Sequence, residues 1–160
     1  MRIGHGMDVH KLAESRELIL CGITIPHERG LLGHSDADVA THALMDALLG
    51  AAALGDIGLL FPDTDETYRG ACSLDLLRVV MTRLKEAGFA PVNVDVTIVA
   101  QRPKLRTYVD RMRQSLAGVM DISVSAVSVK ATTTEQLGYE GKEEGITAHA
   151  VCLVERVACV

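Results

Sequence analysis

The stretch Gly-Met-Asp-Val-His (GMDVH, residues 6–10) decides how the first strand faces the core. Successive side chains of an extended segment point to opposite faces, so Asp8 and His10 share one face and Met7 and Val9 the other. We expect the apolar pair to enter the core, which leaves a carboxylate beside an imidazole. Two ligands at i and i+2 can reach one metal ion, to which a third can be added from elsewhere. A polar surface would account for the same pair.

Length and composition set the broad class. The chain has 160 residues, 48% of them hydrophobic and 23% charged, which predicts one globular domain over residues 1–160. Its net charge of −5 excludes a typical binder of duplex nucleic acid, which needs a basic face. With no Trp, two Phe and three Tyr, it also has little material for a base-stacking platform.

Cysteines and apolar runs indicate the compartment. The four cysteines form no CxxC pair, and three of them lie in apolar runs, so we expect buried free thiols, with disulfides as the alternative. No apolar run reaches the ~20 residues of a membrane span, and the N-terminus shows no signal-peptide pattern. We therefore expect a cytoplasmic protein with no membrane partner. The four cysteines are Cys21, Cys72, Cys152 and Cys159.

Strand and helix patterns alternate along the chain. They predict an α+β (two-layer α/β) fold, with helices packed on one face of a mixed sheet. The first helix is apolar nearly all round, so we expect its surplus Ala face to contact another subunit of a homo-oligomer. The expected strands are 2–9, 17–26, 92–100, 127–133 and 147–157, and the expected helices are 38–54, 73–87 and 104–120.

The segment HSDADVATHALMD, which begins at His34, carries a second polar cluster. Ser35 fits as the N-cap of a capping box with Asp38. His42 lies on an otherwise apolar helix and needs a partner if buried. It is either a metal ligand oriented by Asp46 one turn away, or a core histidine paired with Asp46. His34 lies just before the expected helix N-terminus, where an anion such as phosphate is favoured.

The segment KATTTEQLGYEGK (residues 130–142) is the third cluster. Its threonines offer hydroxyl donors, and Glu135 offers an oxygen ligand suited to Mg²⁺ or Mn²⁺; a β-prone strand end is the alternative explanation. Together, the three clusters in an acidic chain suggest a phosphorylated substrate held through metal ions. The chain has no P-loop, no GxGxxG motif and no GxSxG elbow, which disfavours ordinary nucleotide-binding and covalent acyl chemistry.

These segments resemble the 2-C-methyl-D-erythritol 2,4-cyclodiphosphate synthase family of non-mevalonate isoprenoid biosynthesis. The resemblance covers essentially the whole chain and implies a bacterial, cytoplasmic enzyme that assembles as a homotrimer with active sites between subunits. The matching motifs are GHGMDVH at 4–10, LLGHSDADVATHALMDALLGAAALGDIG at 31–58, FPDTD at 61–65, NVDVTIVAQRPK at 93–104 and VKATTTEQLGYEGKEEGI at 129–146.

The resemblance also implies residue roles. Asp8, His10 and His42 match zinc ligands, and Glu135 matches the ligand of a second ion, Mg²⁺ or Mn²⁺. His34 and Thr133 match the residues that stabilise the transition state. The implied substrate-binding residues, which include the ribose contacts, the loop over the methylerythritol phosphate and the cytidine pocket, are Asp8, Val9, His10, His34, Ser35, Asp56, Ile57, Gly58, Phe61, Pro62, Asp63, Thr64, Asp65, Ala100, Gln101, Arg102, Pro103, Lys104, Leu105, Arg106, Ala131, Thr132, Thr133, Thr134, Glu135, Tyr139 and Lys142.

The implied reaction is attack by the 2-phosphate of 4-diphosphocytidyl-2-C-methyl-D-erythritol 2-phosphate on its own β-phosphorus, with release of CMP. We hypothesise that Asp46 tunes His42. Two other functions remain open: a non-catalytic trimeric module that binds a nucleotide or isoprenoid phosphate, and a zinc phosphohydrolase.

The chain departs from the family pattern at two places. Met7 replaces a familiar Phe, an apolar exchange on the expected core side of the strand. Tyr139 and Lys142 stand where many relatives have a Phe and an Arg that lie near the threefold axis. An isoprenoid diphosphate in the axial cavity of the trimer is therefore an open expectation, because Lys lacks the bidentate fork of Arg. The apolar tail at residues 157–160 has no assigned role.

Overall fold

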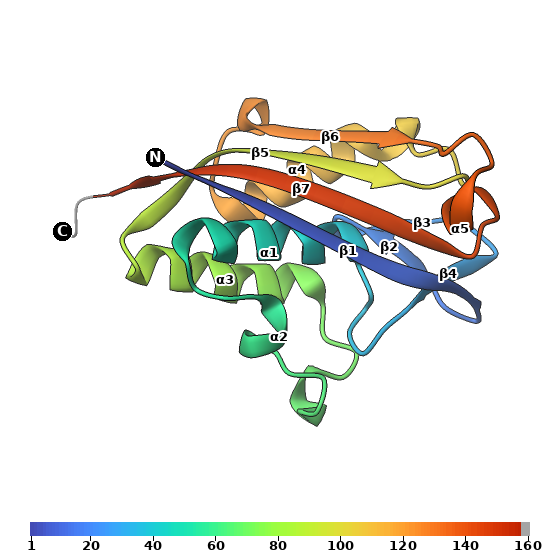
Figure 1. Cartoon of the computed structure of the whole chain (residues 1–160), viewed down its shortest axis with the longest axis horizontal. Helices are drawn as coiled ribbons and strands as arrows, with labels where there is room; N and C mark the ends of the chain where they lie inside the picture. The colour runs from blue at the N-terminus through green and yellow to red at the C-terminus, as the bar shows by residue number, and fades with distance from the viewer. Residues whose placement is uncertain (158–160) are drawn as a thin grey trace.

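The computed structural model describes residues 1–157, and Figure 1 shows a five-stranded sheet backed by helices. The sheet has the order β4-β1-β7-β5-β6; β5 and β6 run parallel, and the other neighbours run antiparallel. The sheet is thus mixed, as expected. Its strands are β1 (Arg2–Glu14), β4 (Arg29–Leu32), β5 (Phe89–Val99), β6 (Val127–Thr132) and β7 (Gly145–Arg156), and a separate hairpin pairs β2 (Leu18–Leu20) with β3 (Ile23–Ile25).

Three long helices form the second layer on one side of the sheet (Figure 1). They are α1 (Val39–Ala52), α3 (Ser73–Glu86) and α4 (Val109–Met120). The expectation of helices on one face of a mixed sheet is confirmed, but α4 begins five residues later than expected because a short 3-10 turn, Arg106–Tyr108, precedes it. The remaining short elements are α2 (Ile57–Leu60), α5 (Gly138–Gly141) and the 3-10 turns Glu66–Tyr68 and Val124–Ala126.

The segment 17–26 is a hairpin and not the single strand that its β-branched and aliphatic residues predict. The chain reverses at Cys21 and Gly22, whose φ angles are 51° and 73°. Glycine adopts such angles without strain, which is why the turn forms there. The chain then continues into β4, which sequence periodicity did not predict.

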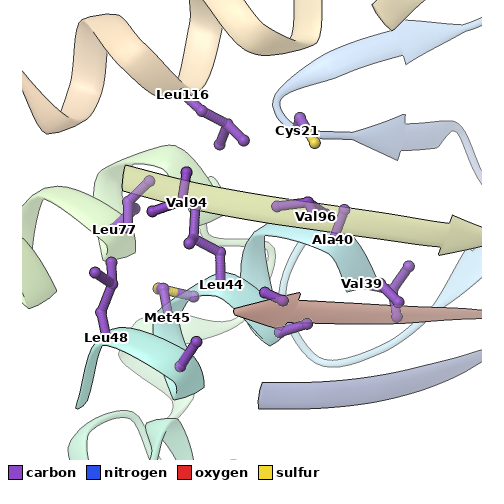
Figure 2. Close-up of a cluster of buried hydrophobic side chains, with 14 of the residues drawn as sticks. Cys21, Val39, Ala40, Leu44, Met45, Leu48, Leu77, Val94, Val96 and Leu116 are labelled. Carbon is purple, nitrogen blue, oxygen red and sulfur yellow. The ribbon is translucent and has the colours of Figure 1, made fainter. Parts of the chain in front are cut away.

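Helix α1 lies between the sheet and α3, and Figure 2 shows its Leu44, Met45 and Leu48 in the core beside Leu77 of α3 and Val94 of β5. Nearly every residue of α1 is buried within the chain itself. The expectation that its Ala face contacts another subunit is therefore wrong, because the sheet covers that face.

Strand β1 has its faces reversed relative to the expectation. Met7 and Val9 are exposed, at 51% and 44%, and do not enter the core. The face with Gly4, Gly6 and Asp8 turns toward α1 instead. A Cβ atom on Gly6 would lie only 2.0 Å from the carbonyl oxygen of Ala43, so glycine lets the helix pack directly on the strand.

The opposite side of the sheet, which we call the open face, carries exposed apolar side chains on β1 and β7. Ile3 is 72% exposed and Val151 is 37% exposed, and they lie alongside Met7 and Val9. His5 and His149 stack on the same face, with ring centroids 5.7 Å apart. Within residues 1–157, no helix has the length and hydrophobicity needed to cross a membrane.

Candidate metal centre and substrate pockets

Three potential metal ligands converge where β1 meets α1. Oδ2 of Asp8 lies 2.9 Å from Nε2 of His10 and 3.0 Å from Nδ1 of His42, and the two imidazole nitrogens are 3.2 Å apart. Asp8 and His10 are partly buried and His42 is buried. The alternation of β1 aims the first two side chains at α1, and the close approach of α1 at Gly6 brings His42 to them.

The hydrogen bond of His10 to the main chain fixes which of its nitrogens is available. Nδ1 of His10 lies 2.8 Å from the carbonyl oxygen of Leu32, which can only accept, so Nδ1 carries the proton. In the neutral ring, the form that binds a metal, the lone pair of Nε2 then points toward Asp8 and His42. Such a second contact orients an imidazole for metal binding.

Charge is concentrated at this cluster. Burial of Asp8 opposes its ionisation, but hydrogen bonds from His10 and His42 and their positive potential outweigh burial and hold the pKa of Asp8 well below its usual range. Burial likewise lowers the pKa of His10, yet its hydrogen bond to Asp8 and the carboxylate charge more than compensate and raise that pKa. A cation between these groups is therefore electrostatically favoured.

The donor set fits a zinc ion. One carboxylate oxygen and two imidazole nitrogens lie within 4.8 Å of one another, and two histidines with one carboxylate are a donor set of catalytic zinc sites that keep a fourth position open. Among the described residues these are the only three such ligands that come together in this way. Of the two alternatives left open for His42, its position beside Asp8 and His10 is consistent with a metal ligand.

The other side of His42 faces two serine hydroxyls. Its Nε2 lies 3.1 Å from Oγ of Ser35 and 3.0 Å from Oγ of Ser73. Asp46, which we expected to orient His42, instead accepts a 2.8 Å hydrogen bond from the backbone of Ile57. The expected direct pairing of Asp46 with His42 is therefore wrong.

The capping of α1 also differs from the expectation. Asp38, not Ser35, is the N-cap, and its carboxylate accepts from the backbone N–H of Thr41. The same carboxylate accepts from the backbone of Cys21 and Gly22, so it ties the β2–β3 hairpin to the helix. Asp38 prevails as the cap because its two oxygens satisfy both segments at once.

A pocket of about 290 Å³ opens beside the metal ligands. His34 lines it from the loop just ahead of α1, the position that we expected, and its Nε2 lies 3.2 Å from the carbonyl oxygen of Asp65. The predicted site residues in this pocket are Asp8, His10, His34, Ser35, His42, Ile57, Gly58, Phe61 and Asp63, joined by Leu32, Gly33, Met45, Tyr68 and Leu76.

A second pocket, of about 330 Å³, lies at the carboxyl ends of the parallel strands β5 and β6. The residues that line it and those that line the first pocket have no member in common. The chain therefore separates the predicted substrate site into two parts. The predicted residues here are Ala100, Gln101, Pro103, Lys104, Leu105, Arg106, Ala131, Thr132 and Thr133, joined by Val109, Val129 and Lys130.

Several predicted residues line neither pocket. Glu135 is exposed at a φ of 53° and accepts a 3.0 Å hydrogen bond from the hydroxyl of Thr133. The hydroxyl of Tyr139 lies 2.6 Å from that of Thr147, and Val9 points to the open face. The remaining predicted residues outside both pockets are Asp56, Pro62, Thr64, Asp65, Arg102, Thr134 and Lys142.

Two polar residues near His42 were missed by sequence reasoning. Ser73 is the first residue of α3, and its hydroxyl and backbone N–H both donate to the carboxylate of Asp36. Nothing local in the sequence links Ser73 to a histidine 31 positions away. The only available signal was that Ser73 and Asp36 both lie at or near a helix start.

Comparison with known proteins agrees with this geometry. The profile of a family described as the YgbB family matches residues 1–155. The chain is 62% identical over 156 residues, 97% of this chain and 99% of the relative, to 2-C-methyl-D-erythritol 2,4-cyclodiphosphate synthase of Desulfitobacterium hafniense strain DCB-2.

Solved structures give the same result. The chain is similar to the bifunctional IspDF of Campylobacter jejuni, with a TM-score of 0.94 and 42% identity over 97% of this chain and 42% of that one. It is also similar to a CDP-bound form of 2C-methyl-D-erythritol-2,4-cyclodiphosphate synthase, with a TM-score of 0.88 and 41% identity over 96% of this chain and all of that one.

Proposed function

Because the chain belongs to the YgbB family of 2-C-methyl-D-erythritol 2,4-cyclodiphosphate synthases, we propose that it carries out their cyclisation with the residues around Asp8, His10 and His42. The enzyme is a phosphorus–oxygen lyase of the methylerythritol phosphate pathway, and it forms 2-C-methyl-D-erythritol 2,4-cyclodiphosphate. The convergence of one carboxylate and two imidazoles in a pocket is the observation that carries the assignment of the site.

The reaction joins two phosphates of one substrate molecule. An oxygen of the 2-phosphate forms a bond to the β-phosphorus, the bond from that phosphorus to the α–β bridging oxygen breaks, and CMP leaves. Since the nucleophile is already an anion, the chain needs to orient the groups and offset their repulsion rather than supply a strong base. Zinc held by Asp8, His10 and His42 would supply Lewis-acid polarisation of a phosphoryl oxygen.

The chain's own residues position the substrate. His34 lines the metal pocket and contacts the backbone of Asp65. It can therefore hold the loop that includes Asp65 in place over the methylerythritol phosphate. The second pocket, poor in aromatic residues, suits a cytidine held through backbone groups and small side chains. Thr133 lines this pocket, and in the transition state its hydroxyl would turn from Glu135 to donate to a phosphate.

Glu135 is the proposed ligand of a second divalent ion, Mg²⁺ or Mn²⁺. Its carboxylate is exposed and held by the hydroxyl of Thr133, which lines the cytidine pocket. An oxygen ligand in this position suits a hard cation between the phosphates of a bound nucleotide.

We propose a homotrimer with active sites between subunits, and two observations support it. The open face presents Ile3, Met7, Val9 and Val151 to solvent, and a group of exposed apolar side chains is typical of an interaction surface. The metal pocket and the cytidine pocket are separate in one chain, although one substrate must reach both. Packing copies through the open face would bury its apolar side chains and allow the metal pocket of one copy to meet the cytidine pocket of the next.

We also propose that an axial cavity of that trimer binds an isoprenoid diphosphate. Lys142 retains a positive charge for the diphosphate, but as a point charge it binds without the two-pronged geometry of Arg. The hydroxyl of Tyr139 is hydrogen-bonded to Thr147, which leaves the edge of its ring for an apolar chain.

The proposal is tested by incubating the purified protein, loaded with zinc, with 4-diphosphocytidyl-2-C-methyl-D-erythritol 2-phosphate and Mg²⁺. We expect CMP and the cyclic diphosphate in a one-to-one ratio, detected by ³¹P NMR, and loss of both in His42→Asn. Release of orthophosphate instead would indicate a phosphohydrolase. Absence of any product from folded, zinc-loaded protein would leave a binding module as the better account.

A further inference from the structure

We propose that Asp36 and Ser73 act as positioning residues that set the tautomer of His42 and thereby the strength of the metal centre. Neither residue lines the metal pocket. They act through His42, on the side of the ring that faces away from Asp8 and His10. This inference rests on the proposal that His42 is a metal ligand.

The two nitrogens of His42 have different surroundings. Nδ1 faces Oδ2 of Asp8 at 3.0 Å and Nε2 of His10 at 3.2 Å, so it is the metal-facing atom. Nε2 faces the hydroxyl oxygens of Ser35 and Ser73, in surroundings where Ser73 is fully buried. Metal binding requires a lone pair on Nδ1, and hence the proton on Nε2.

The hydroxyl of Ser73 dictates that arrangement. A serine hydroxyl has one proton, and in Ser73 this proton is donated to Oδ1 of Asp36. The oxygen of Ser73 can therefore only accept from His42, and Nε2 must carry the proton it accepts. Ser35 cannot impose this direction, because its oxygen accepts from the backbone of Ala37 and its own proton has no such fixed acceptor.

Asp36 is itself held firmly. Its Oδ2 accepts a 2.8 Å hydrogen bond from the backbone N–H of Ser73, and its Oδ1 accepts a 3.2 Å hydrogen bond from the backbone of Asp38 at the start of α1. The carboxylate thus links the starts of α1 and α3, the helices that carry His42 and Ser73. The two hydrogen bonds that connect Asp36, Ser73 and His42 thus orient the lone pair of Nδ1 toward the metal position. In other metal sites a carboxylate has the same effect through a direct hydrogen bond to the histidine.

Asp36→Asn tests the direction in which these hydrogen bonds are donated. With its NH₂ group in the place of Oδ1, Asn keeps an acceptor for the backbone N–H of Ser73 and turns the Ser73 hydroxyl proton toward His42, while the backbone N–H of Asp38 loses its acceptor. Nε2 would then accept, and Nδ1 would carry a proton toward the metal position. Ser73→Ala is the second variant; it keeps the backbone bond to Asp36 and removes only the hydroxyl. Asp75→Asn, an exposed charge loss two residues along α3, is the matched control.

Two measurements are made on each protein. Long-range ¹H–¹⁵N NMR of the metal-free protein reports the His42 tautomer in an Asp8→Ala background, which removes the carboxylate that would otherwise accept a proton from Nδ1; His42→Gln gives the assignment. Competition with a chromophoric chelator, with Asp8 in place, gives the zinc dissociation constant. In the Asp8→Ala background we expect the Nε2–H tautomer when Asp36 and Ser73 are intact, with or without Asp75→Asn. We expect a shift to Nδ1–H in Asp36→Asn, with zinc bound roughly 10- to 100-fold more weakly, and a mixture of tautomers with weakened zinc binding in Ser73→Ala.

An unchanged tautomer and zinc affinity in both Asp36→Asn and Ser73→Ala would overturn the inference, as would an Nδ1–H tautomer in the Asp8→Ala background with Asp36 and Ser73 intact. Failure of the wild type to bind zinc, with the Nε2–H tautomer found in the Asp8→Ala background, would instead count against the proposed metal function alone. Thermal unfolding of each variant identifies any loss of fold, and if one variant is unfolded the other decides.

Discussion

Gly6 of β1 lies so close to Ala43 of α1 that a Cβ atom on the glycine would be 2.0 Å from the carbonyl oxygen of the alanine. This contact sets the distance between the strand that carries Asp8 and His10 and the helix that carries His42. The metal cluster thus depends on a backbone-to-backbone contact that lies outside it.

Gly6→Ala therefore should weaken both the fold and the zinc site. We expect a loss of at least about 2 kcal/mol in the free energy of unfolding, because the helix must move away from the sheet, and a weaker zinc affinity, because His42 moves with it. Gly50→Ala is the control: it lies on the same helix with nothing within 4 Å of its added Cβ, and should be neutral or stabilising. Urea denaturation and chelator competition measure the two effects, and equal behaviour of the two variants would contradict the argument.

Asp38→Ala should destabilise the chain without touching the metal ligands. Its fully buried carboxylate accepts from the backbone of Cys21, Gly22 and Thr41, and from the Thr41 hydroxyl, so its removal leaves buried donors unpaired. We expect the free energy of unfolding to fall by about 3 kcal/mol. Ser123→Ala, which removes an exposed cap, should cost about 1 kcal/mol or less. An equal loss in the free energy of unfolding for Asp38→Ala and Ser123→Ala would refute the role of Asp38.

A charge placed on the open face should dissociate the proposed trimer. Ile3→Glu would put a carboxylate into the apolar contact between copies, and unpaired burial of that charge is strongly unfavourable. Sedimentation velocity should then show monomers, whereas Val79→Glu, an equally apolar-to-acidic change at an exposed position of α3, should leave the trimer intact. A wild type that sediments as a monomer at micromolar concentration would reject the assembly.

The cysteines should differ in reactivity. Burial raises the pKa of Cys152 to about 11, and burial together with the Asp38 charge raises that of Cys21 well above its ordinary value. The thiolate is the reactive form, so a raised pKa lowers reactivity at pH 8. Iodoacetamide at pH 8 should label the exposed Cys72 and spare both buried thiols until urea is added. Peptide mass spectrometry identifies the labelled cysteines, and labelling of Cys152 before urea is added would contradict this prediction.

Residue periodicity predicted the elements better than their orientation. The alternation around Asp8 and His10 separated two faces of β1, yet it could not tell which face is buried, because apolar Met7 and Val9 favoured the wrong one. Gly4 and Gly6 held the missing information, since only residues without a side chain admit a helix that close. The hairpin at Cys21 and Gly22 was hidden in the same way by an unbroken run of β-prone residues.

The candidate site was predicted where its residues were recognisable one by one, and missed where it depends on tertiary contacts. His42 stood out as a polar residue on an apolar helix. Its contact with Ser73, however, joins the starts of two helices and has no local signature. Residue 157 is the last one described, so the apolar tail at 158–160 lies outside the described residues and its role stays open.

The most direct test of the metal centre is an anomalous difference map, collected at the zinc absorption edge, from crystals of the zinc-loaded protein. The account predicts one peak per chain beside Asp8, His10 and His42, about 2.0–2.2 Å from a carboxylate oxygen, Nε2 of His10 and Nδ1 of His42. A peak bonded to Nε2 of His42, or zinc bound elsewhere with this cluster vacant, would contradict it.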